Sequence, residues 1–173
     1  MSYRCLMIAT LALTGCTTLG QVPTQRIASA ELKLANGAPA GTALITAAGD
    51  KLTLSVAAIG LPEGMHGIHL HMVGTCDAPG FATAGGHLNP AGHQHGTLNP
   101  SGSHLGDLPN LEIGKAGVGA LSAQLPGTRA EVEAALFDAD GTALVIHSGP
   151  DDYKTDPSGN SGTRIACGVI KRS

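Results

Sequence analysis

The chain has 173 residues, of which 42% are hydrophobic and only 2% aromatic, with 25 Gly, 10 Pro and no Trp. This composition is typical of a single compact domain built from many short segments and frequent turns, and the length is sufficient for a substantial core. The formal net charge of −3 argues against a broad basic surface, so no nucleic-acid partner is expected.

The first residues have the pattern of an export signal. Arg4 supplies a charged start, and residues 6–13 form an apolar run too short to span a bilayer. Leu13-Thr14-Gly15-Cys16 resembles the bacterial lipobox, whose cysteine is acylated and becomes the mature N-terminus. We therefore expect a lipoprotein signal peptide at 1–15, an N-terminal tether at 16–26 and one domain at 27–173. The alternative is a plain secretory signal in which Cys16 is incidental.

Export and the cysteine count point to the same compartment. A lipid on Cys16 would hold the protein to a membrane on the periplasmic side of the bacterial cell envelope, and Thr17 slightly favours the outer membrane because it is not an obvious inner-membrane retention signal. Cys5 leaves with the signal peptide, so Cys76 and Cys167 remain in an oxidising compartment. We expect them to form a disulfide worth about 2–4 kcal/mol; two buried free thiols are the alternative.

Further along the chain, apolar residues recur with the period of two that is typical of half-buried strands. Leu52, Leu54 and Val56 alternate with polar residues, and Leu32 and Leu34 flank Lys33. Gly and Pro separate further strand-like runs at 42–47, 68–72, 117–125, 134–138, 143–147 and 164–170. Residues 130–135 would also tolerate one helical turn. The sequence predicts an all-β fold, an eight-stranded antiparallel Greek-key sandwich or barrel.

Two long connections interrupt these strands. Residues 74–110 are rich in Gly and Pro and contain four of the eight histidines, and residues 148–162 are polar and rich in Gly and Pro. Connections of this length without their own secondary structure are usually functional or disordered. Because the first contains several metal-ligand residues, we expect two functional loops.

The histidines indicate metal chemistry. His69 and His71 are two residues apart on a predicted strand, so their rings project from the same face. His87, His95, His104 and Asp107 follow in the first loop, and His147 ends a later strand. Imidazole-rich surroundings suit copper, while three His and one carboxylate suit zinc. Seven groups then serve eight positions if one imidazole bridges both metals; His87 is the natural candidate, although spacing alone does not assign it.

Several ordered motifs strengthen this interpretation. They are Gly64-Met65-His66-Gly67-Ile68-His69-Leu70-His71, Gly85-Gly86-His87-Leu88-Asn89-Pro90, His95-Gly96, His104-Leu105-Gly106-Asp107-Leu108, Val145-Ile146-His147 and 162–170. Together they resemble the signatures of copper/zinc superoxide dismutases from about Ala28 to the C-terminus. Asp151-Asp152-Tyr153-Lys154 is similar to bacterial members in particular, so the resemblance is to the bacterial secreted lipoprotein type.

The resemblance implies a role for each motif residue. Copper would be bound by His69, His71, His87 and His147, and zinc by His87, His95, His104 and Asp107. Asp151, or less favourably Asp152, would accept hydrogen bonds from His69 and His95 and orient both rings. Arg164 would lie beside copper at the mouth of the site, and Cys76–Cys167 would be the family disulfide. His66 is expected to be a buried support, and His93 to face solvent, where it could compete with His95 for zinc.

The implied activity is dismutation of superoxide to oxygen and hydrogen peroxide by copper redox cycling, with a structural zinc. His87 would release copper on its reduction, take up a proton and return it. Because superoxide is an anion, Arg164, with Lys154 as a further contributor, would attract it locally. The alternatives are an exported copper/zinc buffer without turnover and a protein that uses zinc structurally. The protein is expected to be a monomer or a homodimer.

Overall fold

A computed structural model describes residues 23–173 of the protein. The predicted signal peptide and Cys16 lie outside these residues, as does most of the predicted tether. The first strand begins at Thr24, so regular structure starts slightly before the predicted domain boundary at residue 27. Within residues 23–173, no helix has the length and apolar character needed to cross a membrane.

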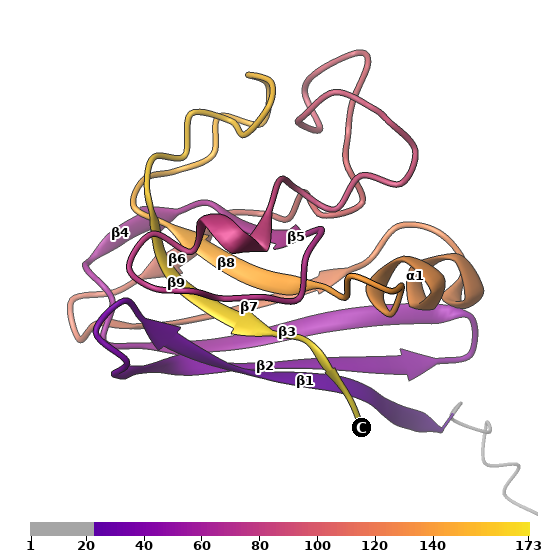
Figure 1. The fold of residues 1–173 in the computed structure, drawn as a ribbon, viewed down its shortest axis with the longest axis horizontal. Helices are drawn as coiled ribbons and strands as arrows, with labels where there is room; N and C mark the ends of the chain where they lie inside the picture. Colours follow the sequence, from indigo (N-terminus) through magenta and orange to yellow (C-terminus); the bar gives the residue numbers. More distant parts are fainter. Residues whose placement is uncertain (1–22) are drawn as a thin grey trace, which may run out of the picture.

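Eight strands form one antiparallel sheet that curls into a half-barrel (Figure 1). Its strands are β1 (Thr24–Leu34), β2 (Pro39–Ala48), β3 (Lys51–Ile59), β5 (Ile68–His71), β7 (Val118–Gln124), β8 (Ala143–His147), β9 (Arg164–Val169) and β10 (Lys171–Arg172). The spatial order is β5-β8-β9-β1-β2-β3-β7, and β10 pairs with β1. Since β9 returns beside β1 of the β1-β2-β3 meander, the arrangement is of the Greek-key type. The predicted eight-stranded antiparallel fold is confirmed.

The period-two pattern places the core as expected. In β3, Leu52, Leu54 and Val56 are buried, whereas Lys51 and Ser55 are exposed. The buried residues face the hydrophobic core together with apolar side chains of β1 and β2. Successive side chains of a strand point to opposite faces, so a single alternating sequence is sufficient to orient each strand on the core.

One predicted strand is wrong. Residues 134–138 were expected to be extended, but most of them belong to helix α1 (Arg129–Leu136). Thr128 accepts a hydrogen bond from the backbone of Glu131, and the Glu131 side chain accepts one from the backbone of Thr128, which is a capping box. Val132 and Leu136, four residues apart, bury the same face of the helix. The Thr-x-x-Glu pattern is the sequence signal that distinguishes this helix from a strand.

Three short strands, of which β10 is one, escaped prediction because two or three residues are too few to show an alternating pattern. β4 (Gly64–His66) pairs with β6 (Leu111–Ile113) in a separate two-stranded sheet. β4 directly precedes β5, and β6 directly follows the first long loop. The small sheet therefore fixes both the start of the His69–His71 strand and the end of the loop that contains the other histidines.

The two long loops lie on the same side of the curled sheet (Figure 1). The 74–110 loop contains one 3-10 turn, η1 (Ala82–Ala84). Cys76 in this loop is bonded to Cys167 in β9, with a Cα–Cα distance of 5.7 Å, so the predicted disulfide is confirmed. By closing a loop of this length, the bond contributes about 2–4 kcal/mol to stability. It fastens the 74–110 loop to the strand that contains Arg164.

Candidate metal centre

The strands bring three of the predicted ligands together at one end of the sheet. β5 pairs with β8 in antiparallel register, with His69 opposite Val145, and His147 is the last residue of β8. All four residues of β5 are buried. The 74–110 loop returns over this end, where His87 forms an isolated backbone bridge with His71. The site is therefore built from two neighbouring strands and a loop distant in sequence.

Four imidazoles meet in the first cluster. His69, His71, His87 and His147 each offer one ring nitrogen, and these atoms lie within 4.8 Å of one another. The nitrogens that face inward are His69 Nδ1, His71 Nε2, His87 Nε2 and His147 Nε2, and each is buried without a hydrogen-bond partner within the described chain. Buried polar atoms are nearly always satisfied, so this convergence of unsatisfied nitrogens fits a metal ion.

The opposite nitrogen of three of these rings is held by a hydrogen bond. His69 Nε2 donates to Asp151 Oδ2 at 2.7 Å, His71 Nδ1 to the carbonyl of Gly85 at 2.9 Å and His147 Nδ1 to the carbonyl of Gly162 at 3.3 Å. Because a neutral imidazole has one donor and one acceptor, these bonds select the tautomer whose free nitrogen points into the cluster. The hydrogen bonds thus orient the free ring nitrogens toward the centre of the cluster.

The second cluster consists of three imidazoles and a carboxylate, and it shares His87 with the first. Asp107 Oδ1 lies 3.0 Å from His87 Nδ1, 3.0 Å from His95 Nδ1 and 3.1 Å from His104 Nδ1. The His87 and His104 Nδ1 atoms are 3.4 Å apart. Zinc bonds of about 2.0–2.1 Å in a tetrahedron separate the ligand atoms by roughly 3.3 Å. The four atoms therefore have the spacing that one tetrahedral zinc requires.

Backbone amides aim the carboxylate of Asp107 at this cluster. Its Oδ2 accepts hydrogen bonds from the amides of Gly96 and His104, both at 2.9 Å, which leaves Oδ1 facing the rings. His104 Nε2 donates to the carbonyl of His93 at 3.1 Å. The His93 ring itself is exposed and lies outside both clusters. Of the two closely spaced histidines in this loop, the structure places His95 with the predicted zinc ligands.

Asp151 joins the two clusters. Its Oδ2 accepts from His69 Nε2 at 2.7 Å, and its Oδ1 accepts from His95 Nε2 at 2.9 Å. The residue is only 3% exposed. Asp152, the less favoured candidate, is exposed and accepts hydrogen bonds from Lys154 and Thr155 in its own loop. The structure thus places Asp151, and not Asp152, between a ring of each cluster.

Burial and neighbouring carboxylates shift the pKa values of the rings in opposite directions. Burial lowers the pKa of His71 to about 2, of His147 to about 3 and of His87 to about 4. Burial also opposes protonation of His95, but the adjacent carboxylates of Asp107 and Asp151 outweigh it and raise the pKa of this ring to about 9. Without metal, the inward rings of the first cluster are neutral at pH 7, the form in which imidazole binds metal ions.

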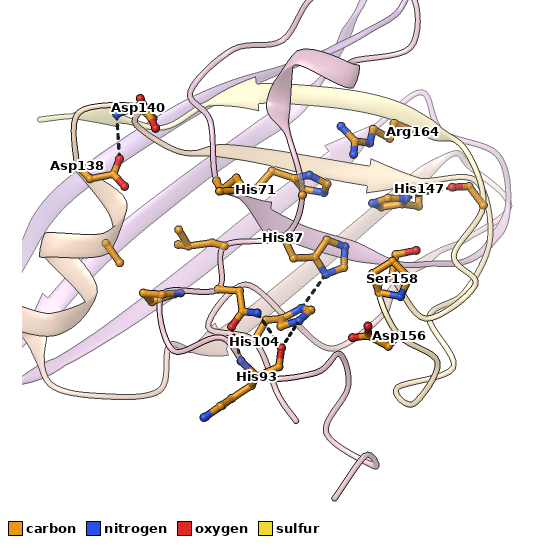
Figure 2. Close-up of a pocket in the computed structure, with 18 residues that line it drawn as sticks. His71, His87, His93, His104, Asp138, Asp140, His147, Asp156, Ser158 and Arg164 are labelled. Atoms are coloured by element: carbon orange, nitrogen blue, oxygen red, sulfur yellow. Dashed lines mark hydrogen bonds between the residues drawn. The ribbon is translucent and has the colours of Figure 1, made fainter. Parts of the chain in front are cut away.

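An open cleft of about 670 Å³ leads to the first cluster. Its lining includes His71, His87, His147 and Arg164, and Arg164 lies near His147 (Figure 2). Arg164 is the only Arg or Lys of the described chain that lines this cleft. Its guanidinium donates to the carbonyls of Phe81 at 2.7 Å and Gly85 at 2.6 Å. Gly85 therefore holds both Arg164 and His71 with one carbonyl oxygen.

The remaining charges around the cleft differ from the sequence-based expectation. Lys154, predicted to assist Arg164, is exposed on the second loop and does not line the cleft. Three carboxylates do line it, those of Asp138, Asp140 and Asp156. The lining of the cleft therefore combines three carboxylates with one guanidinium, so its positive potential rests on Arg164.

His66 is a structural residue, as expected. Its ring is only 2% exposed and is bonded on both sides, with Nδ1 2.7 Å from the carbonyl of His147 and Nε2 3.0 Å from the carbonyl of Pro62. Sequence reasoning missed the carbonyl of Gly85, which accepts from His71 and Arg164. It also missed the side chain of Asn110, which bonds to the main chain of Asp151. A carbonyl acceptor and a single Asn before a short strand leave no local pattern. Tyr153 was part of a recognised motif but had no assigned role.

Comparison with known proteins identifies the fold family. Residues 39–170 match the family model for copper/zinc superoxide dismutase. Superoxide dismutase (Cu-Zn) 2 of Aquifex aeolicus is 45% identical over 148 residues, which cover 83% of this chain and 86% of the relative. The crystal structure of a SOD-like protein from Bacillus subtilis has a TM-score of 0.76 and 38% identity, and the match covers 83% of this chain and 97% of the other.

A second solved structure gives the same result. Cu/Zn superoxide dismutase from Brucella abortus has a TM-score of 0.63 and 31% identity, and the match covers 86% of this chain and all of the other. The matched region contains both histidine clusters, the shared His87 and the disulfide. The chain belongs to the copper/zinc superoxide dismutase family.

Proposed function

We propose that the protein dismutates superoxide, converting two superoxide anions and two protons to one oxygen and one hydrogen peroxide. The observation that carries this proposal is the set of four buried imidazoles whose free nitrogens converge without a partner, beside a second cluster that shares His87. A protein that only stores metal does not need an imidazole common to two sites, nor an open cleft that ends at one of them beside an arginine.

The donor sets assign the metals. Copper would be bound by His69 Nδ1, His71 Nε2, His87 Nε2 and His147 Nε2, because an all-imidazole set suits Cu(II). Zinc would be bound through Nδ1 of His87, His95 and His104 and Oδ1 of Asp107, a closed set of the structural type. When bound, copper supplies one-electron redox chemistry by alternating between its oxidised and reduced states.

The protein's own residues bind the substrate and hold a proton. Arg164 presents a fixed cationic fork at the end of the cleft, which attracts and orients a small anion. His87 Nε2 would take up a proton in the half-reaction in which it is released from copper and would return it to the departing peroxide, with solvent supplying the second proton. The zinc cluster holds His87 through its other nitrogen, so the ring stays in place. Asp151 keeps His69 and His95 oriented.

Superoxide dismutation by purified protein tests the proposal. The protein loaded with copper and zinc is compared with metal-free protein and with a His147→Ala variant. Rapid turnover in the loaded wild type alone is expected, because both controls lack a complete copper site. Stoichiometric binding of both metals without turnover would contradict the enzyme assignment and support the copper/zinc buffer.

Arg164→Ala is expected to lower kcat/KM by about tenfold or more and to weaken its dependence on ionic strength, since Arg164 is the one Arg or Lys among residues 23–173 that lines the cleft. Copper content should stay unchanged because Arg164 is not a ligand. Lys154→Ala removes a charge from the second loop outside the cleft and is the matched control. Loss of copper in the Arg164 variant, or an equal effect of Lys154→Ala, would refute attraction by Arg164.

We further propose that the protein is an exported lipoprotein, acylated on Cys16 and held at the periplasmic face of the envelope, with the outer membrane favoured over the inner membrane. The lipobox-like Leu13-Thr14-Gly15-Cys16 supports this. The Cys76–Cys167 disulfide also supports export, because disulfides form and persist in oxidising compartments. Labelling with a radioactive fatty acid in a bacterial host tests it. The wild type should carry label and sediment with membranes, and Cys16→Ser should do neither. An unlabelled wild type would contradict the lipoprotein proposal and support a plain secretory signal.

A further inference from the structure

Asp151 lies in an irregular loop, so specific contacts must hold its carboxylate in position. Its carboxylate must stay between His69 and His95, which belong to different clusters, yet the residue lies in the irregular 148–162 loop and not in a strand. A carboxylate on an unsupported loop would have many alternative positions. Contacts with the 74–110 loop, together with a hydrogen bond inside the second loop, therefore define the position of this side chain.

Asn110 supplies the first of these contacts. Its Nδ2 donates to the carbonyl of Asp151 at 2.9 Å, and its Oδ1 accepts from the amide of Asp151 at 2.8 Å. One side-chain amide thus satisfies both main-chain groups of Asp151, as a neighbouring strand would. Asn110 lies between the predicted zinc ligand Asp107 and strand β6, so it links Asp151 to the segment that forms the zinc cluster.

Tyr153 supplies the second set of contacts. Its amide donates to Asp151 Oδ1 at 2.6 Å, its hydroxyl accepts from the amide of Asn110 at 2.7 Å, and its carbonyl accepts from the amide of Leu98 at 2.9 Å. The first bond lies within the second loop, and the other two join that loop to two parts of the first. Tyr153 has a φ of 60°, a left-handed conformation that is unfavourable for a bulky residue. These hydrogen bonds hold it there.

Close packing leaves the two loops little freedom to separate at this point. A Cβ at Gly96 would lie 2.1 Å from the carbonyl oxygen of Tyr153, and one at Gly159 would lie 1.8 Å from Asp151 Oδ1. Both glycines have positive φ values, +100° and +64°. The backbone at Gly96 therefore lies directly against Tyr153 of the other loop, and the backbone at Gly159 lies directly against Asp151 in its own loop. A side chain at either glycine would not fit.

We propose that Asn110 and Tyr153 form a clamp of positioning residues that holds Asp151 between His69 and His95 and thereby sets the zinc affinity of the site. The proposal rests on the proposed function, since it assumes that His95 and its neighbours bind zinc. The clamp acts through orientation: it fixes the main chain of Asp151, Asp151 fixes the Nε2 side of His95, and the Nδ1 side of that ring then faces the zinc cluster.

The test measures zinc affinity of the full-length mature protein by competition with a chromophoric chelator, in wild type and in Asn110→Ala and Tyr153→Phe variants. Tyr153→Phe removes only the hydroxyl that accepts from the amide of Asn110 and keeps the aromatic ring. Loss of a residue that directly orients a ligand weakens metal binding by about 10–100-fold, which is the expectation for Asp151→Asn. The clamp residues act one step further out, so a weakening of about 3–10-fold is expected for each.

Asn99→Ala is the matched control. Asn99 is also an asparagine of the first loop, and it bonds to Gln94 and to the carbonyl of Lys154, but not to Asp151. It should leave zinc affinity unchanged. Cobalt bound in place of zinc provides a second readout: the visible absorption bands, which respond to ligand geometry, should shift in the two clamp variants and not in the control.

The outcomes separate the clamp from the proposed function. Wild-type zinc affinity and cobalt bands in both clamp variants would overturn the clamp alone, even if the variants unfolded at a lower temperature, because that result would show a merely structural role. Wild-type protein that binds no zinc would overturn the proposed function and the clamp with it. The expected result is weaker zinc binding and shifted cobalt bands in both clamp variants. Asn99→Ala should show neither change.

Discussion

Replacement of His87 by alanine is expected to reduce superoxide dismutation by at least about 100-fold, since loss of even an outer partner of a metal ligand costs about 10–100-fold. The ring belongs to both clusters, with Nε2 in the first and Nδ1 3.0 Å from Asp107 Oδ1 in the second. Both metals should therefore be bound more weakly. Steady-state kinetics, together with copper and zinc content after dialysis against a chelator, measure the two effects.

The matched control for this experiment is His93→Ala. His93 is exposed, lies in the same loop and belongs to neither cluster. Its support of His104 comes from its carbonyl, which alanine retains. The control should keep both metals and its activity. A His87→Ala protein that retains copper and zinc, or a His93→Ala protein that loses zinc to the same extent, would contradict the shared-ligand assignment.

Metal loading should raise the unfolding temperature substantially. Five buried ring nitrogens have no hydrogen-bond partner within residues 23–173, and a bound metal would satisfy them. The ligands lie between His69 and His147 in sequence, so only the folded chain brings them together. Metal at 1,000 times its Kd stabilises the fold by about 4 kcal/mol. At roughly 2–4 °C per kcal/mol for a chain of this size, the midpoint should rise by about 8–16 °C.

Calorimetry of metal-free, zinc-loaded and fully loaded protein checks this prediction with the disulfide intact. His147→Ala separates the two metals, because His147 belongs only to the first cluster. This variant should keep the increment from zinc and lose most of the increment from copper. Equal midpoints for metal-free and loaded wild type would show that the clusters do not bind metal in the folded state.

Much of the fold follows from local sequence patterns. The alternation of Leu52, Leu54 and Val56 with polar residues is visible in five consecutive positions, and it determines which face of β3 is buried. Residues 130–135 were left open between a helical turn and a strand, and 134–138 were assigned to a strand, because Ala-rich segments fit both patterns over so few residues. The capping box of helix α1, Thr128 with Glu131, was present in the sequence and favours the helix.

For the site, residue type and strand period in the sequence indicated candidate metal ligands, the His-x-His pair and the loop histidines with Asp107, and the cysteine count indicated a disulfide. The role of Arg164 and the assignment of ligands to each metal came from the resemblance to copper/zinc superoxide dismutases. Residue type and strand period are local properties, so they can be read without coordinates. Only the tertiary structure decided which nitrogen of each ring is free, that Arg164 and His71 share the Gly85 carbonyl, and that Asn110 and Tyr153 hold Asp151. These depend on contacts between segments far apart in the chain, and no local pattern encodes such contacts.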